Sequence, residues 1–243
     1  PPPVPKLRSS AGAITNLNEL TITIDFGQPV LNFNFGDVKF RRPESNSTVT
    51  VKFGWDLFDI EESRGVYRVR LYDISGEGEF SVYLLPGSFT DQSGNTGPGS
   101  FLRLLRDTTP PPAPVITSNE GLVTSSNRVD ISVSFSEPVK GFSEDDIDIQ
   151  SGGLEVKTEI YQVSVSEYLV GTIVEGTGNF SLSVPSGSCT DLAGNAVPPN
   201  SIFVTRSLTA SRNPTLVSNK GLQTSAKAFN VTFHFHEAVE GFV

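Results

Sequence analysis

Acidic and amide side chains that could hold calcium occur in three short stretches of the sequence. One contains Asp145, Asp146 and Asp148, and an Asp-x-x-Gly-Asn pattern ends at Asn95 and again at Asn195. Their hard oxygen atoms suit calcium, although no twelve-residue loop with the complete ligand spacing is present and Asp before Gly-Asn also forms ordinary turns. The candidate ligands are Asp91, Asn95, Asp145, Asp146, Asp148, Asp191 and Asn195, and we expect no other cofactor.

Two neighbouring histidines could bind zinc or simply face solvent. His234 and His236 are two residues apart, so a β-strand would place both on one face. No third ligand accompanies them, and the repeat described below aligns them with Ser134 and Ser136, which we expect to point outward. We therefore interpret the histidines as exposed side chains. Because no histidine precedes His234, a Ser-His-Asp arrangement in the first 200 residues or so is impossible.

The stretch of residues 53–62 combines carboxylates with aromatic rings. It contains Asp56, Asp59, Glu61 and Glu62 together with Phe53, Trp55 and Phe58. Two carboxylates facing each other across a cleft could cleave glycosides, but nothing in the sequence places these so. We expect no catalytic residue, and we interpret the aromatic residues either as core or as a loop that binds sugar or protein.

Three sequences of the type Asn-x-Ser/Thr are candidate glycosylation sites, at Asn46, Asn179 and Asn230. The one cysteine, Cys189, cannot form a disulfide within the chain. In the repeat it takes the position of Phe89, so we expect it to be a small buried hydrophobic residue.

The composition excludes several classes of function. The 243 residues include 18 basic and 27 acidic side chains, a formal net charge of −9, so the cationic surface typical of nucleic-acid binding is missing. No apolar run approaches the ~20 residues of a membrane-spanning helix. The 22 glycines and 17 prolines favour a fold rich in turns over a helical one.

The sequence repeats itself with a period near 100 residues. Segment 1–5 matches 110–114 at a shift of 109, whereas 76–81 matches 176–181 and 118–122 matches 218–222 at a shift of 100. We therefore expect one unit at 1–109, a second at 110–210 and the start of a third at 211–243. The first unit must hold nine extra residues between Asp37 and Gly76, and we expect the chain to be a segment of a longer tandem array.

Within each unit the apolar residues alternate with polar ones. The runs Leu20–Phe26, Val129–Phe135 and Phe229–Phe235 show this period of two, which is typical of a strand with one buried face. Gly, Pro, Asn and Asp clusters separate the runs at short spacing, as in hairpin connections. Six to eight short strands in 100 residues predict an all-β fold of tandem immunoglobulin-like antiparallel sandwiches joined by Pro-rich linkers.

Three segments resemble the bacterial-type Ig-like repeats of large cell-surface proteins. They are Phe135–Ile147, Val184–Asn195 and the linker Asp107–Pro112. The likeness covers residues 107–206. It is partial in the first unit, where Gln28 replaces the glutamate and Asn32-Phe33 replaces Gly-Phe, and it covers the third unit only as far as the chain extends.

This resemblance implies an extracellular, non-enzymatic array. Such repeats occur in adhesins and other long surface chains, and they are similar to domains of algal flagellar-hair proteins. The implied role is a stiff rod, adhesive stalk or filament component that contacts neighbouring repeats, copies of the same chain, other surface proteins or glycans. The alternative is a carbohydrate-binding accessory region of a larger secreted enzyme, which exposed aromatic rings around Trp55 would favour.

The two joints differ in proline content. The segment 109–114 favours extended polyproline II, which is stiff over several residues, whereas 207–214 has a single proline and should bend more easily. The start of the third unit presents Phe229, Val231, Phe233 and Phe235 on one face. About thirty residues cannot close a sandwich, so either more of the chain follows or strands from elsewhere complete the unit.

Charge is distributed unevenly between the units. Residues 1–106 carry 11 basic and 12 acidic side chains, whereas residues 107–206 carry 4 and 13. One hypothesis is that Arg41, Arg42, Arg68 and Arg70 contact the acidic second unit of a neighbouring chain, a head-to-tail contact that would build a filament. The alternative is a solvated polar face.

Overall fold

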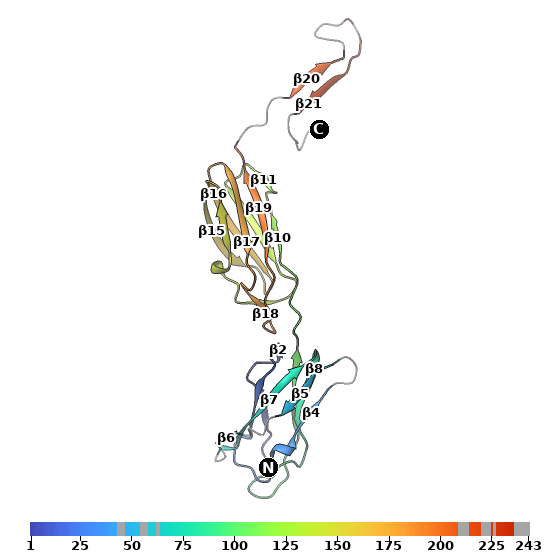
Figure 1. The fold of residues 1–243 in the computed structure, drawn as a ribbon, viewed down its shortest axis with the longest axis vertical. Helices are drawn as coiled ribbons and strands as arrows, with labels where there is room; N and C mark the ends of the chain where they lie inside the picture. Colours follow the sequence, from blue (N-terminus) through green and yellow to red (C-terminus); the bar gives the residue numbers. More distant parts are fainter. Residues whose placement is uncertain are drawn as a thin grey trace.

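The protein is built from short β-strands. The computed structural model describes residues 1–42, 47–53, 58–61, 64–208, 214–219, 225 and 227–235, with residues 58–61 described by their backbone. In these residues the other regular elements are two single-turn 3-10 helices, η1 (Phe35–Asp37) and η3 (Glu144–Asp146). Figure 1 shows the strands in successive groups along the long axis of the chain. Across the described residues, no helix has the length and apolar character needed to span a membrane.

The first unit pairs two antiparallel sheets. One sheet has the order β1 (Lys6–Ser9), β3 (Leu20–Asp25), β7 (Val66–Ser75) and β5 (Thr50–Phe53), and β6 (Phe58–Glu61) also pairs with β7. The other has the order β2 (Ile14–Thr15), β9 (Ser100–Arg106), β8 (Gly78–Leu84) and β4 (Val38–Arg41), in which β2 runs parallel to β9.

The second unit repeats this topology. One sheet has the order β10 (Val115–Ser118), β12 (Arg128–Ser134), β16 (Glu167–Glu175) and β15 (Glu155–Gln162). The other has the order β11 (Val123–Thr124), β19 (Asn200–Arg206), β17 (Gly178–Val184) and β14 (Asp148–Ser151). The short strands β13 (Val139–Lys140) and β18 (Thr190–Asp191) form a further pair. Named A to G in chain order, the main strands give the sheets ABED and CFG of a constant-type immunoglobulin sandwich. Beyond this unit, β20 (Thr215–Ser218) pairs with β21 (Val231–His234).

Each sandwich encloses a hydrophobic core of its own. On β12, Val129, Ile131 and Val133 are fully buried while the residues between them face outward. The buried cluster of the first unit uses residues 20–104 and that of the second uses residues 129–204, and no residue belongs to both. The predicted all-β fold of tandem Ig-like sandwiches is confirmed, whereas the unit boundaries stay predictions.

Cys189 is part of the second core. It is 3% exposed and packs among the buried residues, as Phe89 does in the first core. Burial, with a contribution from the Asp146 carboxylate, raises the pKa of the Cys189 thiol to about 11. The residue behaves as the small hydrophobic group that its alignment with Phe89 predicted.

A matching group of aromatic rings closes one end of each core. Phe135, Phe142 and Tyr168 meet edge to face in the second unit, with ring centroids 4.7 to 5.9 Å apart. Phe26, Phe33 and Tyr67 do the same in the first. The residues before the middle ring, Asn32 (φ 64°) and Gly141 (φ 83°), share the left-handed conformation, which Asn tolerates. The Asn32-Phe33 departure from the family pattern therefore preserves the local structure.

Strand register locates the extra residues of the first unit. Lys52 pairs with Tyr72 as Lys157 pairs with Ile173, so β5 and β15 are offset by 105, whereas β4 and β14 keep the offset of 109. Four extra residues therefore precede β5 and four separate β5 from β7. The ninth is Asp73, which lies in a bulge of β7 with φ 49°.

Because the cores are separate, replacing a buried ring should affect one unit only. Phe80 and Phe180 occupy the same position in the two units and are 0% and 1% exposed. We expect Phe80→Ala to lower the free energy of unfolding of the first unit by about 3–5 kcal/mol, and Phe180→Ala to do the same to the second. Differential scanning calorimetry should show one transition moving in each variant. Equal shifts of all transitions in both variants would contradict separate cores.

Candidate functional site

The contact between the two units is centred on Asn195. Its side chain is 7% exposed, and Oδ1 accepts a hydrogen bond of 3.1 Å from Nδ2 of Asn16 in the first unit. Nδ2 of Asn195 donates to the backbone oxygens of Asp107 and Thr109, at 3.0 and 3.3 Å. One side chain thus links the second unit to the first unit and to the connecting segment.

Asp191 holds Asn195 in place. Oδ1 of Asp191 accepts hydrogen bonds of 2.7 to 2.9 Å from the backbone N–H groups of Ala193, Gly194 and Asn195, and Oδ2 accepts one from the Asn195 side chain at 2.8 Å. Burial alone would raise the pKa of Asp191, but these hydrogen bonds outweigh burial and hold the pKa below its ordinary value. The carboxylate is therefore ionised and preorganises the turn that meets the first unit.

The same turn exists in the first unit without these extra contacts. Asp91 accepts hydrogen bonds from the backbone of Ser93 and Asn95 and from the Asn95 side chain, and the side-chain bond contributes most to a lowered pKa of Asp91. Asn95, however, is exposed. The sequence pattern therefore encodes a self-capped turn, and its position beside another unit makes that turn a joint.

Backbone contacts reinforce the joint. Asn16 N donates to the oxygen of Ala193 at 3.0 Å, and Asp107 N donates to the oxygen of Thr15 at 3.1 Å. Thr108 N lies 3.1 Å from both carboxylate oxygens of Glu77. In Figure 1 the end of the first unit that carries β2 faces the β18 end of the second. Asn16 could not be found from the repeat, because the equivalent position in the second unit is a serine, Ser125.

Glu137 lies close enough to the carboxylates of Asp191 and Asp107 to be influenced by them. Burial raises the pKa of Glu137, and the carboxylates of Asp191 and Asp107 raise it further. A cation beside them would relieve this repulsion. Among the described residues, however, no group of three or more His, Cys, Asp or Glu side chains is arranged to hold a metal ion.

The predicted calcium ligands do not form one site. Asp91 and Asn95 belong to the first unit, and Asp191 and Asn195 satisfy each other in the second. Of the three aspartates near η3, Asp146 accepts hydrogen bonds of 2.8 Å from the backbone and hydroxyl groups of Ser143. Calcium binding by these residues stays a prediction.

The other candidate residues are dispersed. His234 is exposed on β21, and His236 lies outside the described residues. Asn179 and Asn230 are exposed, whereas Asn46 is not described. Trp55, Asp56 and Glu62 also lie outside the described residues, as do the side chains of Phe58, Asp59 and Glu61. The glycosylation sites and the sugar-binding loop around Trp55 stay predictions.

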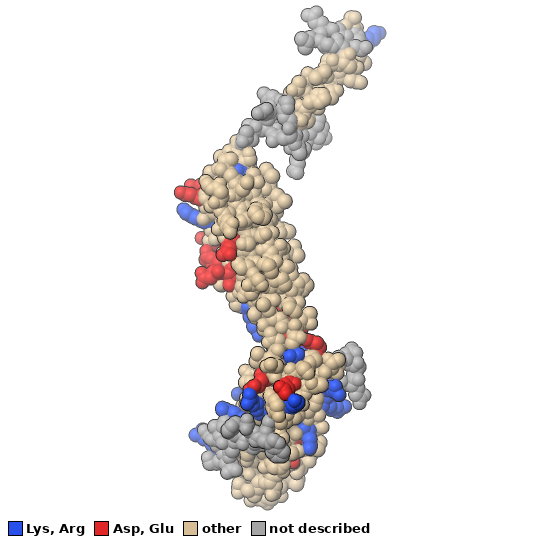
Figure 2. Space-filling model, viewed as in Figure 1, with Lys and Arg blue, Asp and Glu red and all other residues tan. Residues whose placement is uncertain are grey.

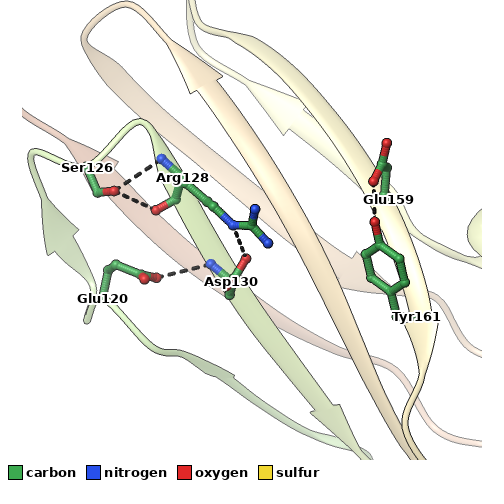
Figure 3. A network of polar contacts seen from close by, with 6 residues as sticks. All are labelled: Glu120, Ser126, Arg128, Asp130, Glu159 and Tyr161. Carbon is green, nitrogen blue, oxygen red and sulfur yellow. Dashed lines mark hydrogen bonds and ion pairs between the residues drawn. The ribbon is translucent and has the colours of Figure 1, made fainter.

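The outer face of β12, β16 and β15 carries a polar network, drawn in Figure 3. Arg128 Nε donates to Asp130 Oδ1 at 3.0 Å, and Glu120 accepts from the backbone of Asp130 at 3.1 Å. The hydroxyl of Tyr161 donates to Glu159. Figure 2 shows acidic side chains along this flank of the second unit and basic ones over the first.

The four arginines singled out in the first unit do not share a face. Arg41 is in β4, whereas Arg68 and Arg70 are in β7 of the opposite sheet. Arg70 already pairs with Glu19, its Nη2 lying 2.6 Å from Oε2. One sheet-to-sheet contact with an acidic neighbour could therefore use only part of this set.

A comparison with protein families matches residues 107–202 to the bacterial Ig-like domain. This match confirms the resemblance for the second unit. No curated protein matches the chain.

Three solved structures to which the chain is similar are distant in sequence. Invasin, described as a bacterial integrin-binding protein, is 13% identical over 88% of this chain with a TM-score of 0.39, and this chain spans 41% of that structure. Domains 5–6 of the S-layer protein SbsC are 13% identical, with 84% and 99% of the two chains covered and a TM-score of 0.23. The N-terminal eight Ig domains of Down syndrome cell adhesion molecule are 12% identical, with 98% and 31% covered and a TM-score of 0.28.

Removing the Asn195 side chain should loosen the joint. Asn195→Ala deletes the contacts to Asn16, Asp107 and Thr109, each contributing about 1 kcal/mol. Asn95→Ala is the control, because it removes the equivalent side-chain hydrogen bond to Asp91 within the turn of the first unit but no contact between units. Spin labels on cysteines placed at exposed Glu79 and Ser201 should give a broader distance distribution in Asn195→Ala only. Buried Cys189 should not react with the label. Distributions of equal width in both variants would show that Asn195 does not hold the joint.

Calcium binding can be tested by thermal unfolding in excess chelator. If calcium binds at Asp145, Asp146 or Asp148, chelation should lower the melting temperature of the second unit, and added calcium should restore it. Asp148→Asn, at an exposed position, should weaken that response. A melting curve that excess chelator leaves unmoved would rule out a structural calcium ion.

Proposed function

We propose that this chain, whose residues 107–202 match the bacterial Ig-like domain, is a non-catalytic structural or adhesive segment of an extracellular cell-surface protein. The observation that carries the proposal is the hydrogen-bonded joint at Asn195 between two units with separate cores. A chain of such units extends reach from a surface while each unit remains stable by itself.

The joint favours a rod over a flexible string. Four hydrogen bonds connect the Asn195 turn to Asn16 and to residues 107–109, and a fifth joins Asp107 N to the oxygen of Thr15. A linker of flexible residues without such contacts would leave the units free to reorient, whereas these contacts must break before the joint can bend. Stiffness is the mechanical property that a surface spacer needs.

A carbohydrate-binding accessory region of a larger secreted enzyme is the second candidate. Of the aromatic residues that would test it, Trp55 and the side chain of Phe58 lie outside the described residues, whereas Phe53 is half-buried and packs against the first core. A groove on the first unit, lined by arginines and aromatic rings, favours this candidate. Both candidates place the chain outside the cell.

Surface exposure can be tested in the source organism. Antibodies raised against this chain should label intact cells, and electron microscopy should show the label on slender projections, because successive stiff units extend away from the envelope. Labelling that requires prior permeabilisation of the cells would contradict the proposal. An antibody against a cytoplasmic protein provides the control for cell integrity.

A further inference from the structure

The first unit carries a groove on the outer face of the sheet β2-β9-β8-β4. Its volume is about 570 Å³, and its walls include Arg41, Ser81, Tyr83, Phe101 and Arg103. This volume lies within the usual range of ligand sites in proteins. Gly99 permits the close packing at one end, since a Cβ there would lie 2.8 Å from the oxygen of Leu84.

Cations are arranged in register across this face. Arg41 pairs with Ser81 and Ser81 with Arg103, so the two arginines lie in one row, about 10 Å apart at the backbone. Lys39 is two residues before Arg41 on β4 and points to the same side, about 7 Å away. All three side chains are exposed, and none of the described residues that line the groove is acidic; exposed Glu79 lies on the same face, two residues before Ser81. The groove therefore has a positive local charge within a unit of nearly balanced charge.

Two aromatic rings lie in the adjacent row. Tyr83 pairs with Phe101 across β8 and β9, and Lys39 pairs with Tyr83 on the other side. Phe101 is 64% exposed, and the guanidinium carbon of Arg103 lies 5.7 Å from its ring centroid. An exposed phenyl ring with a guanidinium over it offers a ligand both an apolar surface and an adjacent cation.

The second unit lacks this arrangement on the same face. The register places Gln150 where Arg41 stands, Ser183 and Ser201 where the two rings stand, and Phe203 where Arg103 stands. Asp148 takes the place of Lys39. Since the second sandwich closes without these side chains, the fold does not require them in the first.

We infer that the groove binds an acidic polysaccharide, through its carboxylate or sulfate groups and the apolar faces of its sugar rings. The planar guanidinium groups of Arg41 and Arg103 present paired N–H donors that match carboxylate and sulfate oxygens. Tyr83 and Phe101, in the row beside the two arginines, stack on a sugar ring, and the hydroxyl of Ser81, between the arginines, can bond to a sugar hydroxyl group. The row of cations along the sheet suits a polymer with repeated negative charges.

A second copy of this chain is a less suitable occupant. Its acidic flank on β15 and β16 is interrupted by Lys157 and Arg128, which would face the groove cations with like charge. Asp130 is already bonded to Arg128, and Glu159 to Tyr161. A free polyanion offers the groove unpaired negative charges, whereas this flank offers partly neutralised ones.

The inference deepens the adhesive part of the proposed function by naming a ligand class. All the groove residues belong to the first unit, so binding does not depend on the stiffness of the joint. A failure to bind polysaccharide would leave the spacer proposal standing, and a flexible joint would leave the groove intact.

Binding can be measured by isothermal titration calorimetry with the whole chain. Alginate oligosaccharides probe carboxylate recognition, dextran sulfate probes sulfate recognition, and neutral dextran is the control polymer. Two double variants take residues from the second unit, Arg41→Gln with Arg103→Phe, and Tyr83→Ser with Phe101→Ser. A matched control, Lys6→Gln with Arg68→Gln, removes two exposed charges from the opposite sheet.

We expect the chain to bind at least one acidic polymer and not neutral dextran. Each groove variant should bind about tenfold or more weakly with unchanged melting temperature, and the matched control should bind like the unmodified chain. Loss of binding in the control equal to that in the arginine variant would mean diffuse charge attraction and overturn the inference. So would binding to neither polymer, or unchanged affinity in either groove variant. Self-association in the ultracentrifuge that the arginine variant abolishes would instead assign the groove to a second copy.

Discussion

The closure of a separate hydrophobic core inside each unit is the constraint on which the rest of the structure depends. A core without a disulfide must be stable through burial alone, and each fully buried Val, Ile, Leu or Phe contributes about 1.5–3 kcal/mol. The strict alternation along strands such as β3 and β12 places one residue in two inside. Because those positions are committed to the core, the outward positions are free to differ between the units.

The joint uses this freedom at one end of the sandwich. Asp191 is 1% exposed, and both of its carboxylate oxygens accept hydrogen bonds from N–H donors of the same turn. This arrangement fixes Asn195, whose remaining hydrogen-bonding capacity is directed to the neighbouring unit. The buried Asp191 carboxylate therefore orders the neutral side chain of Asn195, and Asn195 makes the contacts between units.

The outer faces of the sheets use the freedom of their outward positions in a different way. Arg70 of β7 corresponds to Gly171 of β16, and Arg103 of β9 corresponds to Phe203 of β19. The first unit consequently presents a groove of cations and rings, while the second presents a network in which Arg128 and Asp130 pair with each other. Two copies of one fold can in this way present different outer surfaces around similar cores.

The sequence by itself determined the fold class, the tandem repetition and the burial of Cys189. The fold class follows from local patterns, because the period of two and the turn residues act over a few residues. The repetition and the burial of Cys189 follow from aligning the units with each other. The tertiary structure alone decided which outward residues meet. Asn16 and Asn195 are 179 residues apart, and Arg41 and Arg103 lie in one row with a strand between them. It also separated Arg41 from Arg68, which the charge count had grouped, because β4 and β7 belong to opposite sheets and a count of charges carries no information about the face.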